Sequence, residues 1–240
     1  MHYCLAILLT LSAGADVTLK QVRALARNYL RDSTEVPMSV DVSTLVTDLN
    51  GKAKHQGHLT AGMVFRGYNL KEKKFSLNAT KGGLTPFGLM DSLGGDMAAF
   101  FGGSALFWSD DSKIEVQQPS GAGKPVTVNI QDATCPPLDL SPKYLFPKHA
   151  CGETQITLIS SEGGDLAIQH VSFESTGAPA TTQVSHLGLV QLNAYHYDVD
   201  FQLKTLPGET KPYLWPLKSV VSATTAKGTV TITNQYSAKR

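Results

Sequence analysis

Most of the chain is a succession of segments in which apolar and polar residues alternate, and this period of two constrains the fold more than any other feature. The first such segment, at 36–46, has an apolar residue at every second position from Val36 to Val42, and the segments at 58–68 and 73–80 continue the pattern. Successive side chains of a β-strand point to opposite faces. The alternation therefore predicts strands with one buried and one exposed face.

Seven further strand segments follow residue 112, and short turn sequences separate them. DLNGK at 48–52 and AKG at 226–228 are of hairpin type, and no long helical segment is inserted between most neighbours. This spacing favours an antiparallel meander over a series of β-α-β units. The further segments lie at 113–116, 125–130, 154–160, 165–175, 187–204, 217–225 and 228–237.

Two segments have the period of a helix instead. The first, at 16–33, is amphipathic, and the second, at 85–101, begins with Thr85-Pro86 and ends at Gly102-Gly103. The second helix carries aspartates and small residues on one side, so we do not expect it to span a membrane. Its other side is adaptable and apolar, suited either to filling the core or to bordering an apolar cavity. The candidate cavity residues are Phe87, Met90, Leu93, Met97, Phe100 and Phe101.

These elements together predict a mainly β (α+β) fold, a single curved antiparallel sheet or half-barrel with helices covering its concave face. The proline-rich stretch at 136–147 could instead be a linker between two domains, but each half would then have an open sheet edge. We therefore expect one β-rich domain over residues 16–240.

The N-terminal 15 residues have the pattern of a secretory signal peptide. Cys4 to Leu11 form an apolar segment too short to span a bilayer, and Ala13 and Ala15 occupy the small-residue positions of a cleavage site. The n-region lacks Lys and Arg, and a buried N-terminal strand or helix is the alternative. We expect cleavage before Asp16 and a periplasmic or extracellular location.

The cysteines fit an exported protein. Cys4 would leave with the signal peptide, and the remaining pair, Cys135 and Cys151, is expected to form a disulfide in an oxidising compartment. A structural zinc site is a poor alternative, because it needs four ligands and only His149 lies near the pair.

Charge and motifs argue against several classes of function. The net charge is +1 and no basic block occurs, so a nucleic-acid-binding surface is not expected. PSGAGKP at 119–125 resembles part of a phosphate-binding loop, but Gln118 and Pro125 replace its first glycine and its magnesium-binding hydroxyl. Ser104 lacks the second glycine of a nucleophile elbow. We expect no catalytic residue, metal or cofactor.

Three histidines are scattered over different strands, and no motif ties an acid or a nucleophile to them: His170, His186 and His196. On a strand, the spacing of His55 and His58 directs their rings to opposite faces, which does not favour a shared metal. Asp198 and Asp200 alternate with apolar residues, which places both carboxylates on the face opposite the core. Such a pair is usually only solvated.

The predicted elements follow the order helix, three strands, inserted helix and meander, and the chain closes with the run YHYDVDFQLKTLPGETKPYLWPLKSVVSATTAKGTVTITNQYS. This order, and the C-terminal run above all, resembles the periplasmic lipoprotein-carrier family and its mycobacterial lipid-binding relatives. The resemblance implies a half-barrel wrapped over helices, with an apolar interior that holds acyl chains. The Cys135 and Cys151 pair and the proline-rich loop depart from that family. The expected function is a non-enzymatic carrier for a lipid or other apolar ligand. A structural or adhesion domain of the cell envelope and a hydrolase assembled only in space are the alternatives.

Overall fold

The computed structural model describes residues 35–66, 69–81, 113–117, 124–131, 152–160, 166–176, 180–184, 188–205, 208, 210 and 212–238. Within these ranges the chain forms eleven strands and no helix. The expected signal peptide at 1–15, the predicted helices at 16–33 and 85–101, Cys135 and Cys151 lie outside the described residues. The strands are β1 Glu35–Thr47, β2 Ala53–Arg66, β3 Asn69–Lys81, β4 Lys113–Gln117, β5 Val126–Gln131, β6 Gly152–Ser160, β7 Leu166–Ser175, β8 Ala180–Val184, β9 Gly188–Thr205, β10 Pro212–Thr225 and β11 Gly228–Ala238.

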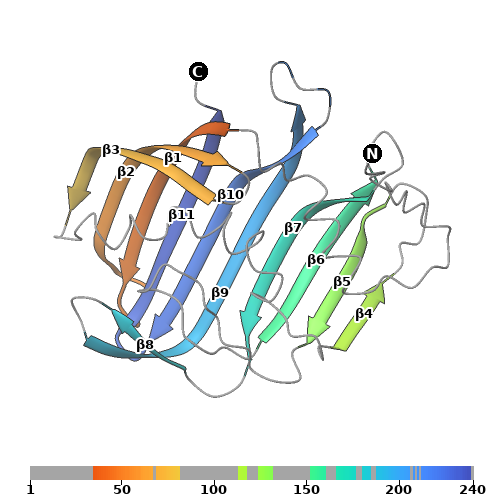
Figure 1. Cartoon of the computed structure of the whole chain (residues 1–240). Coiled ribbons are helices and arrows are strands. Elements are labelled where there is room, and N and C mark those ends of the chain that lie inside the picture. Colours follow the sequence, from red (N-terminus) through yellow and green to blue (C-terminus); the bar gives the residue numbers. More distant parts are fainter. Residues whose placement is uncertain are drawn as a thin grey trace.

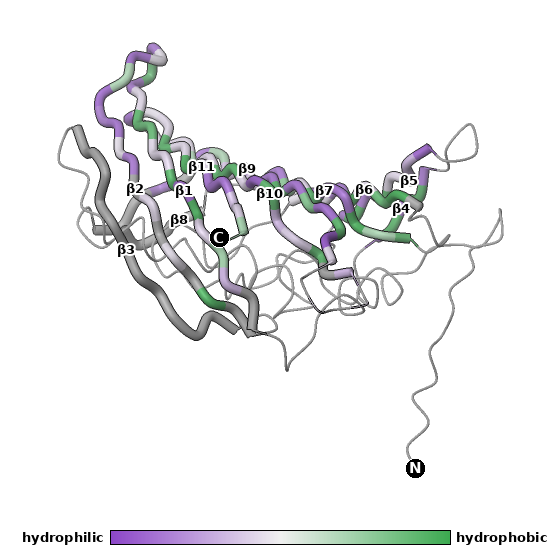
Figure 2. The backbone as a smooth tube through the Cα atoms, turned by 90° about the horizontal axis from the view of Figure 1, so that it is seen from above, coloured by the Kyte–Doolittle hydropathy of each residue, from purple (hydrophilic) through white to green (hydrophobic). Residues whose placement is uncertain are grey.

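All eleven strands belong to one antiparallel sheet, which is open (Figure 1). The order across the sheet is β3-β2-β1-β11-β10-β9-β7-β6-β5-β4, and β8 pairs with the first part of β9. Seen at right angles to Figure 1, the sheet is twisted and curved (Figure 2). The expectation of a mainly β protein built on an antiparallel sheet is thus confirmed.

The first and last strands of the described chain lie side by side in the interior of the sheet. β1 pairs with β11 from Met38, opposite Ala238, to Thr47, opposite Thr229. The β1-β2-β3 meander is therefore joined to the rest of the sheet through β11, while β3 and β4 form the two edges. β10 and β11 complete this junction as a hairpin.

One face of the sheet is buried and apolar, and we call it the buried face. Met38, Val40 and Val42 are fully buried on β1, as the alternation predicted. Its large fully buried side chains include Phe173 and Tyr197. Burying a large apolar side chain contributes about 1.5–3 kcal/mol, so this face is a main source of the stability of the fold. The opposite face is called the outer face.

The β1–β2 hairpin turn forms where DLNGK predicted it. The amides of Asn50 and Lys52 both donate to Asp48 Oδ1 at 3.0 Å, and Gly51 has a φ of 76°. The hydrogen bond from Lys54, with those from the turn amides, lowers the pKa of the Asp48 carboxyl. Asp48 thus fixes the turn through its side chain, as Asx turns do.

Four elements differ clearly from the sequence-based expectation. β2 begins at Ala53 rather than at 58, and β3 begins at Asn69 rather than at 73. β8 was not predicted, because its sequence ATTQV lacks alternating apolar residues. β10 begins at Pro212, five residues before the predicted start at 217. Residues 212–216 pair with β9, whereas pairing with β11 begins at Lys218, so the prolines do not interrupt a ladder on both sides. Leu217 is skipped in the register with β9 and is partly exposed, as expected of a bulge.

Candidate functional site

The outer face is covered by polar side chains that pair across neighbouring strands. The Thr60 hydroxyl donates to Asp41 at 2.6 Å, and the amide of Gln155 donates to Asn129 at 3.0 Å. Similar pairs join Ser222 to Thr231 at 3.2 Å. These contacts connect side chains directly opposite one another in the register. The outer face is thus built of polar cross-strand rows, which stabilise adjacent strands without burying apolar surface.

The densest of these polar groups joins β7 to β9, and we call it the histidine–carboxylate row. His170 Nδ1 lies 2.7 Å from Asp200 Oδ1, and its Nε2 lies 3.3 Å from Asp198 Oδ1. His196 contacts Asp198 through Nε2 and Glu174 through Nδ1. Acids and imidazoles therefore alternate in the order Asp200, His170, Asp198, His196 and Glu174.

Strand register explains why these five groups meet. His196, Asp198 and Asp200 occupy alternate positions of β9, so all three lie on the outer face. His170 is directly opposite Asp200, and Glu174 is directly opposite His196. The placement of Asp198 and Asp200 opposite the core is confirmed, because Tyr197, Val199 and Phe201 between and beside them are buried.

The row favours the charged form of His196. Partial burial by itself lowers the pKa of His196, but hydrogen bonds to Asp198 and Glu174 and the negative charge of both carboxylates outweigh this effect. The pKa of His196 is therefore raised above its usual value. Only the imidazolium can donate from both ring nitrogens at once, so the observed pair of contacts is that of a protonated ring.

The same geometry is unfavourable for acid–base catalysis. A catalytic histidine needs one nitrogen directed at a nucleophile or substrate, while the other is held by an acid. Both nitrogens of His170 and of His196 face carboxylates instead. Ser172 lies opposite Asp198 in the register rather than opposite a histidine. The row can store and release protons, and it can hold two strands together, without a group placed for nucleophilic attack.

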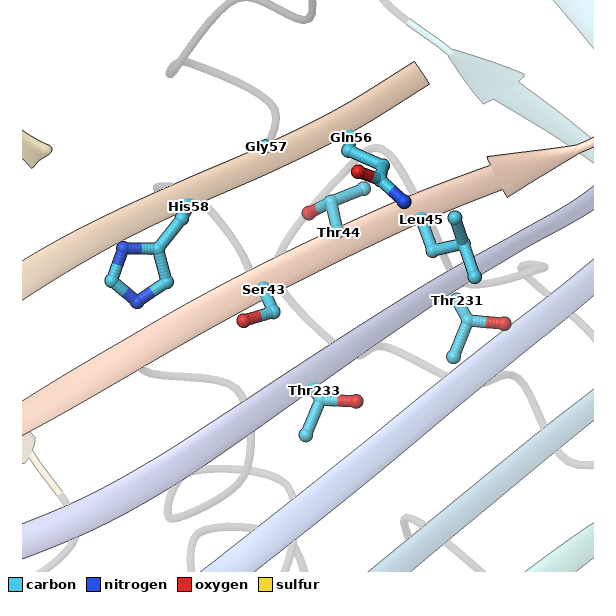
Figure 3. Close-up of a pocket in the computed structure, with 8 residues that line it drawn as sticks. All are labelled: Ser43, Thr44, Leu45, Gln56, Gly57, His58, Thr231 and Thr233. Carbon is cyan, nitrogen blue, oxygen red and sulfur yellow. The ribbon is translucent and has the colours of Figure 1, made fainter. Parts of the chain in front are cut away.

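A second feature is a groove over β2, β1 and β11, shown in Figure 3. Its volume is about 450 Å³, and its polar groups are hydroxyls, one amide and one imidazole. His58 and Ser43 are opposite each other in the register, yet no hydrogen bond joins their side chains. Among the described residues that line the groove, no nucleophile is therefore paired with a base. The residues that line it include Gln56, His58, Ser43, Leu45, Thr231 and Thr233.

The predicted cavity residues cannot be compared with the described structure. Phe87, Met90, Leu93, Met97, Phe100 and Phe101 lie outside the described residues, as do Cys135 and Cys151. His55 and His58 both lie on one strand, β2, as expected. Among the described residues, no group of three or more histidine, cysteine or acidic side chains is arranged to hold a metal ion.

Sequence reasoning missed the histidine–carboxylate row. It placed Asp198 and Asp200 on the outer face but treated them as solvated, and it treated His170 and His196 as scattered over different strands. One signal was available, because HYDVD at 196–200 has a histidine or acid at every alternate position, and HVSFE at 170–174 has one at each end. Their pairing depends on the β7–β9 register, which the sequence alone does not reveal.

Comparison with models of known protein families, with curated proteins and with solved structures finds no match. Within the described ranges there is also no helix long and apolar enough to cross a membrane. The sheet and its two faces are therefore the features that bear on function.

Proposed function

We propose that the chain is an exported, non-enzymatic carrier or binding protein for a lipid or another ligand with an acyl chain. The observation that carries this proposal is the buried face, which is mostly apolar from β1 through β7. Its members come from every strand in between, including Val40, Ile232, Val221, Tyr197 and Phe173. A wide curved sheet of this kind can enclose an apolar ligand on one side while the polar outer face meets water.

The finer architecture is part of the same proposal. A half-barrel whose concave face is covered by helices at 16–33 and 85–101 would let the flexible side of the second helix border the ligand. Unbranched and aromatic side chains repack easily around ligands of different shape. The outer face supports a binding role over a hydrolytic one, because neither the row nor the groove pairs a nucleophile with a free base.

Export and a disulfide complete the proposal. Removal of residues 1–15 would leave Cys135 and Cys151 as the only cysteines. The intact mass of the exported chain, measured before and after thiol alkylation, tests both points. We expect a chain that begins at Asp16 and takes up no alkylating reagent until it is reduced. A retained Met1, or alkylation of both thiols without reduction, would contradict them.

The binding function can be tested with the full chain purified from its own cell envelope. Native mass spectrometry should show a co-purifying lipid, and a fluorescent fatty acid should bind saturably after delipidation. Leu93→Asp, on the apolar side of the predicted helix, should lower the affinity for the probe by tenfold or more, about 1.4 kcal/mol. Ser92→Asp is the matched control, since residue 92 falls on the opposite side of that helix, and it should bind as the parent does.

The result that would overturn the carrier is also defined. If the delipidated chain binds no probe and the native chain carries no lipid, the buried face is a filled core. That outcome would favour the structural or adhesion domain. Far-UV circular dichroism of both variants shows whether a loss of binding is only a loss of folding.

A further inference from the structure

The pairing between β7 and β9 is the shortest between two interior strands of the described sheet. The backbone ladder between β7 and β9 covers only residues 170–174 and 196–200, and just beyond it the Tyr195 amide donates to Ser175 Oγ at 2.8 Å. By contrast, β10 follows β9 from Thr205 to Leu192. We call this short junction the seam. It divides the sheet into one part that runs from β3 to β9 and another that runs from β7 to β4.

The two faces of the seam are held differently. On the buried face, Val171 and Phe173 of β7 pack with Tyr197 and Val199 of β9, and all four are buried. On the outer face, the side chains that bridge the seam are those of the histidine–carboxylate row. His170 bridges to Asp198 and Asp200, and Glu174 bridges to His196. The four apolar side chains do not titrate, whereas the outer-face positions of the seam carry titratable groups except at Ser172.

We propose that the histidine–carboxylate row is a proton-dependent latch that closes the seam between the two parts of the sheet. With its imidazole protonated, His196 donates to Glu174 across the seam and to Asp198 on its own strand, and it neutralises part of the acidic charge. When His196 loses its proton, one of these two carboxylates loses its donor. Glu174 of β7 and Asp198 of β9 then repel each other across the seam with less compensation. The latch is independent of the proposed ligand.

The direction of the pH effect follows from the partners. The pKa of His196 is raised in the folded chain, so its stabilising contacts are complete below the ordinary histidine pKa and are lost as pH rises through the raised value. The seam is therefore tighter in mildly acidic than in mildly alkaline solution.

The strands on either side of the row carry two further charged groups. On β10, Lys218 is opposite Asp200, and the uncharged Ser222 is opposite His196. On β6, Glu153 is opposite Glu174 and accepts a hydrogen bond from Gln131 at 3.1 Å. One cation and one further acid thus flank the row, on opposite sides. They leave acidic groups in excess around His196, in keeping with its raised pKa.

Amide hydrogen exchange of the full chain tests the latch. Protection factors of amides 170–174 and 196–200 are compared with those of the β1–β11 ladder at pH 6 and pH 8, after correction for intrinsic exchange. We expect the ratio of seam to ladder protection to fall by about fivefold at the higher pH, the factor for an exposed charge pair worth about 1 kcal/mol. In the double variant His170→Gln, His196→Gln the ratio should no longer change with pH.

His55→Gln is the matched control, because His55 is exposed on β2 away from the seam, and it should keep the parent's pH response. If the double variant does not fold, Glu174→Gln replaces it, since the Glu174 side chain is 59% exposed and contacts His196. Glu174→Gln should shift the loss of seam protection to lower pH, because it removes one of the two carboxylates that raise the pKa of His196. A ratio that stays constant with pH in the parent chain, or a double variant that responds as the parent does, would overturn the proposal.

Discussion

At the scale of single residues, Gly228 is the described glycine whose position tolerates an added side chain least. It opens β11 directly after the β10–β11 turn and has a φ of 142°, which side-chain-bearing residues rarely adopt. A Cβ atom there would lie 1.9 Å from the carbonyl oxygen of Thr47 on β1. The contact is with backbone, so a rotamer change cannot relieve it. The glycine is required both for the turn and for the close approach of β1 to β11.

Gly228→Ala should therefore destabilise the protein by about 2–4 kcal/mol, because strain and steric overlap add. Urea unfolding at neutral pH measures the change in the free energy of unfolding. Gly51→Ala is the matched control: Gly51 also has a positive φ, but no atom lies within 4 Å of the added methyl group. It should cost only about 1–2 kcal/mol. Equal losses at the two positions would show that the contact with Thr47 has no energetic weight.

The face of a residue was predictable from sequence, whereas its partners were not. Alternation alone placed Met38 in the core and Asp198 and Asp200 outside it, since a strand fixes which side chains share a face. Nothing in the sequence sets the register of β7 against β9, which are separated by β8 and its connections. The histidine–carboxylate row exists only because of that register.

At the scale of elements, one buried polar pair joins β10 to β11 within the apolar face. Asn234 Nδ2 donates to Ser219 Oγ at 3.0 Å, and the two residues are opposite each other in the register. Both are almost completely buried. Because a buried polar group must be hydrogen-bonded, this pair favours one register of the hairpin over a slip by two residues.

Ser219→Ala should destabilise the chain by about 1–3 kcal/mol, because the Asn234 amide loses a buried acceptor. The double variant Ser219→Ala, Asn234→Leu should recover much of this loss, since both polar groups are then gone. Denaturant unfolding of the single and double variants measures the coupling. Additive losses would mean that the hydrogen bond does not couple the two strands.

Strand positions followed from the sequence better than strand ends did. The predicted segment at 228–237 matches β11 almost fully, because its turn and its alternation are both clear. β10 starts earlier than expected, because the prediction treated prolines as strand ends. Pro212 and Pro216 instead lie where β10 pairs with β9 alone. Its boundary was decided by the neighbouring strand rather than by local sequence.

At the scale of the whole molecule, β11 is the strand that connects β1 to the rest of the sheet. It pairs with β1 on one side and β10 on the other. Without it, the β1-β2-β3 meander would keep no backbone pairing to β10. Isolated groups of two or three strands are marginally stable in water.

A chain that stops after residue 227 should therefore show no cooperative thermal transition. A synthetic peptide of residues 228–240 added in excess should restore one, because it supplies both missing ladders. A peptide with the same composition in scrambled order is the control and should have no effect. Near-UV circular dichroism during heating detects the transition. A truncated chain that melts cooperatively at the midpoint of the full chain would contradict this role of β11.

The pairing of β1 with β11 also sets a delay during synthesis. Ser39 and Ser237 form a hydrogen bond although they are 198 residues apart in the chain. At translation rates of roughly 5–20 residues per second, about 10–40 s pass between the emergence of one and the emergence of the other. Throughout that interval an edge of β1 has no strand to pair with, and unpaired edges and uncovered apolar surface promote aggregation. A nascent chain of this topology is thus open to aggregation unless another molecule covers β1 before β11 emerges.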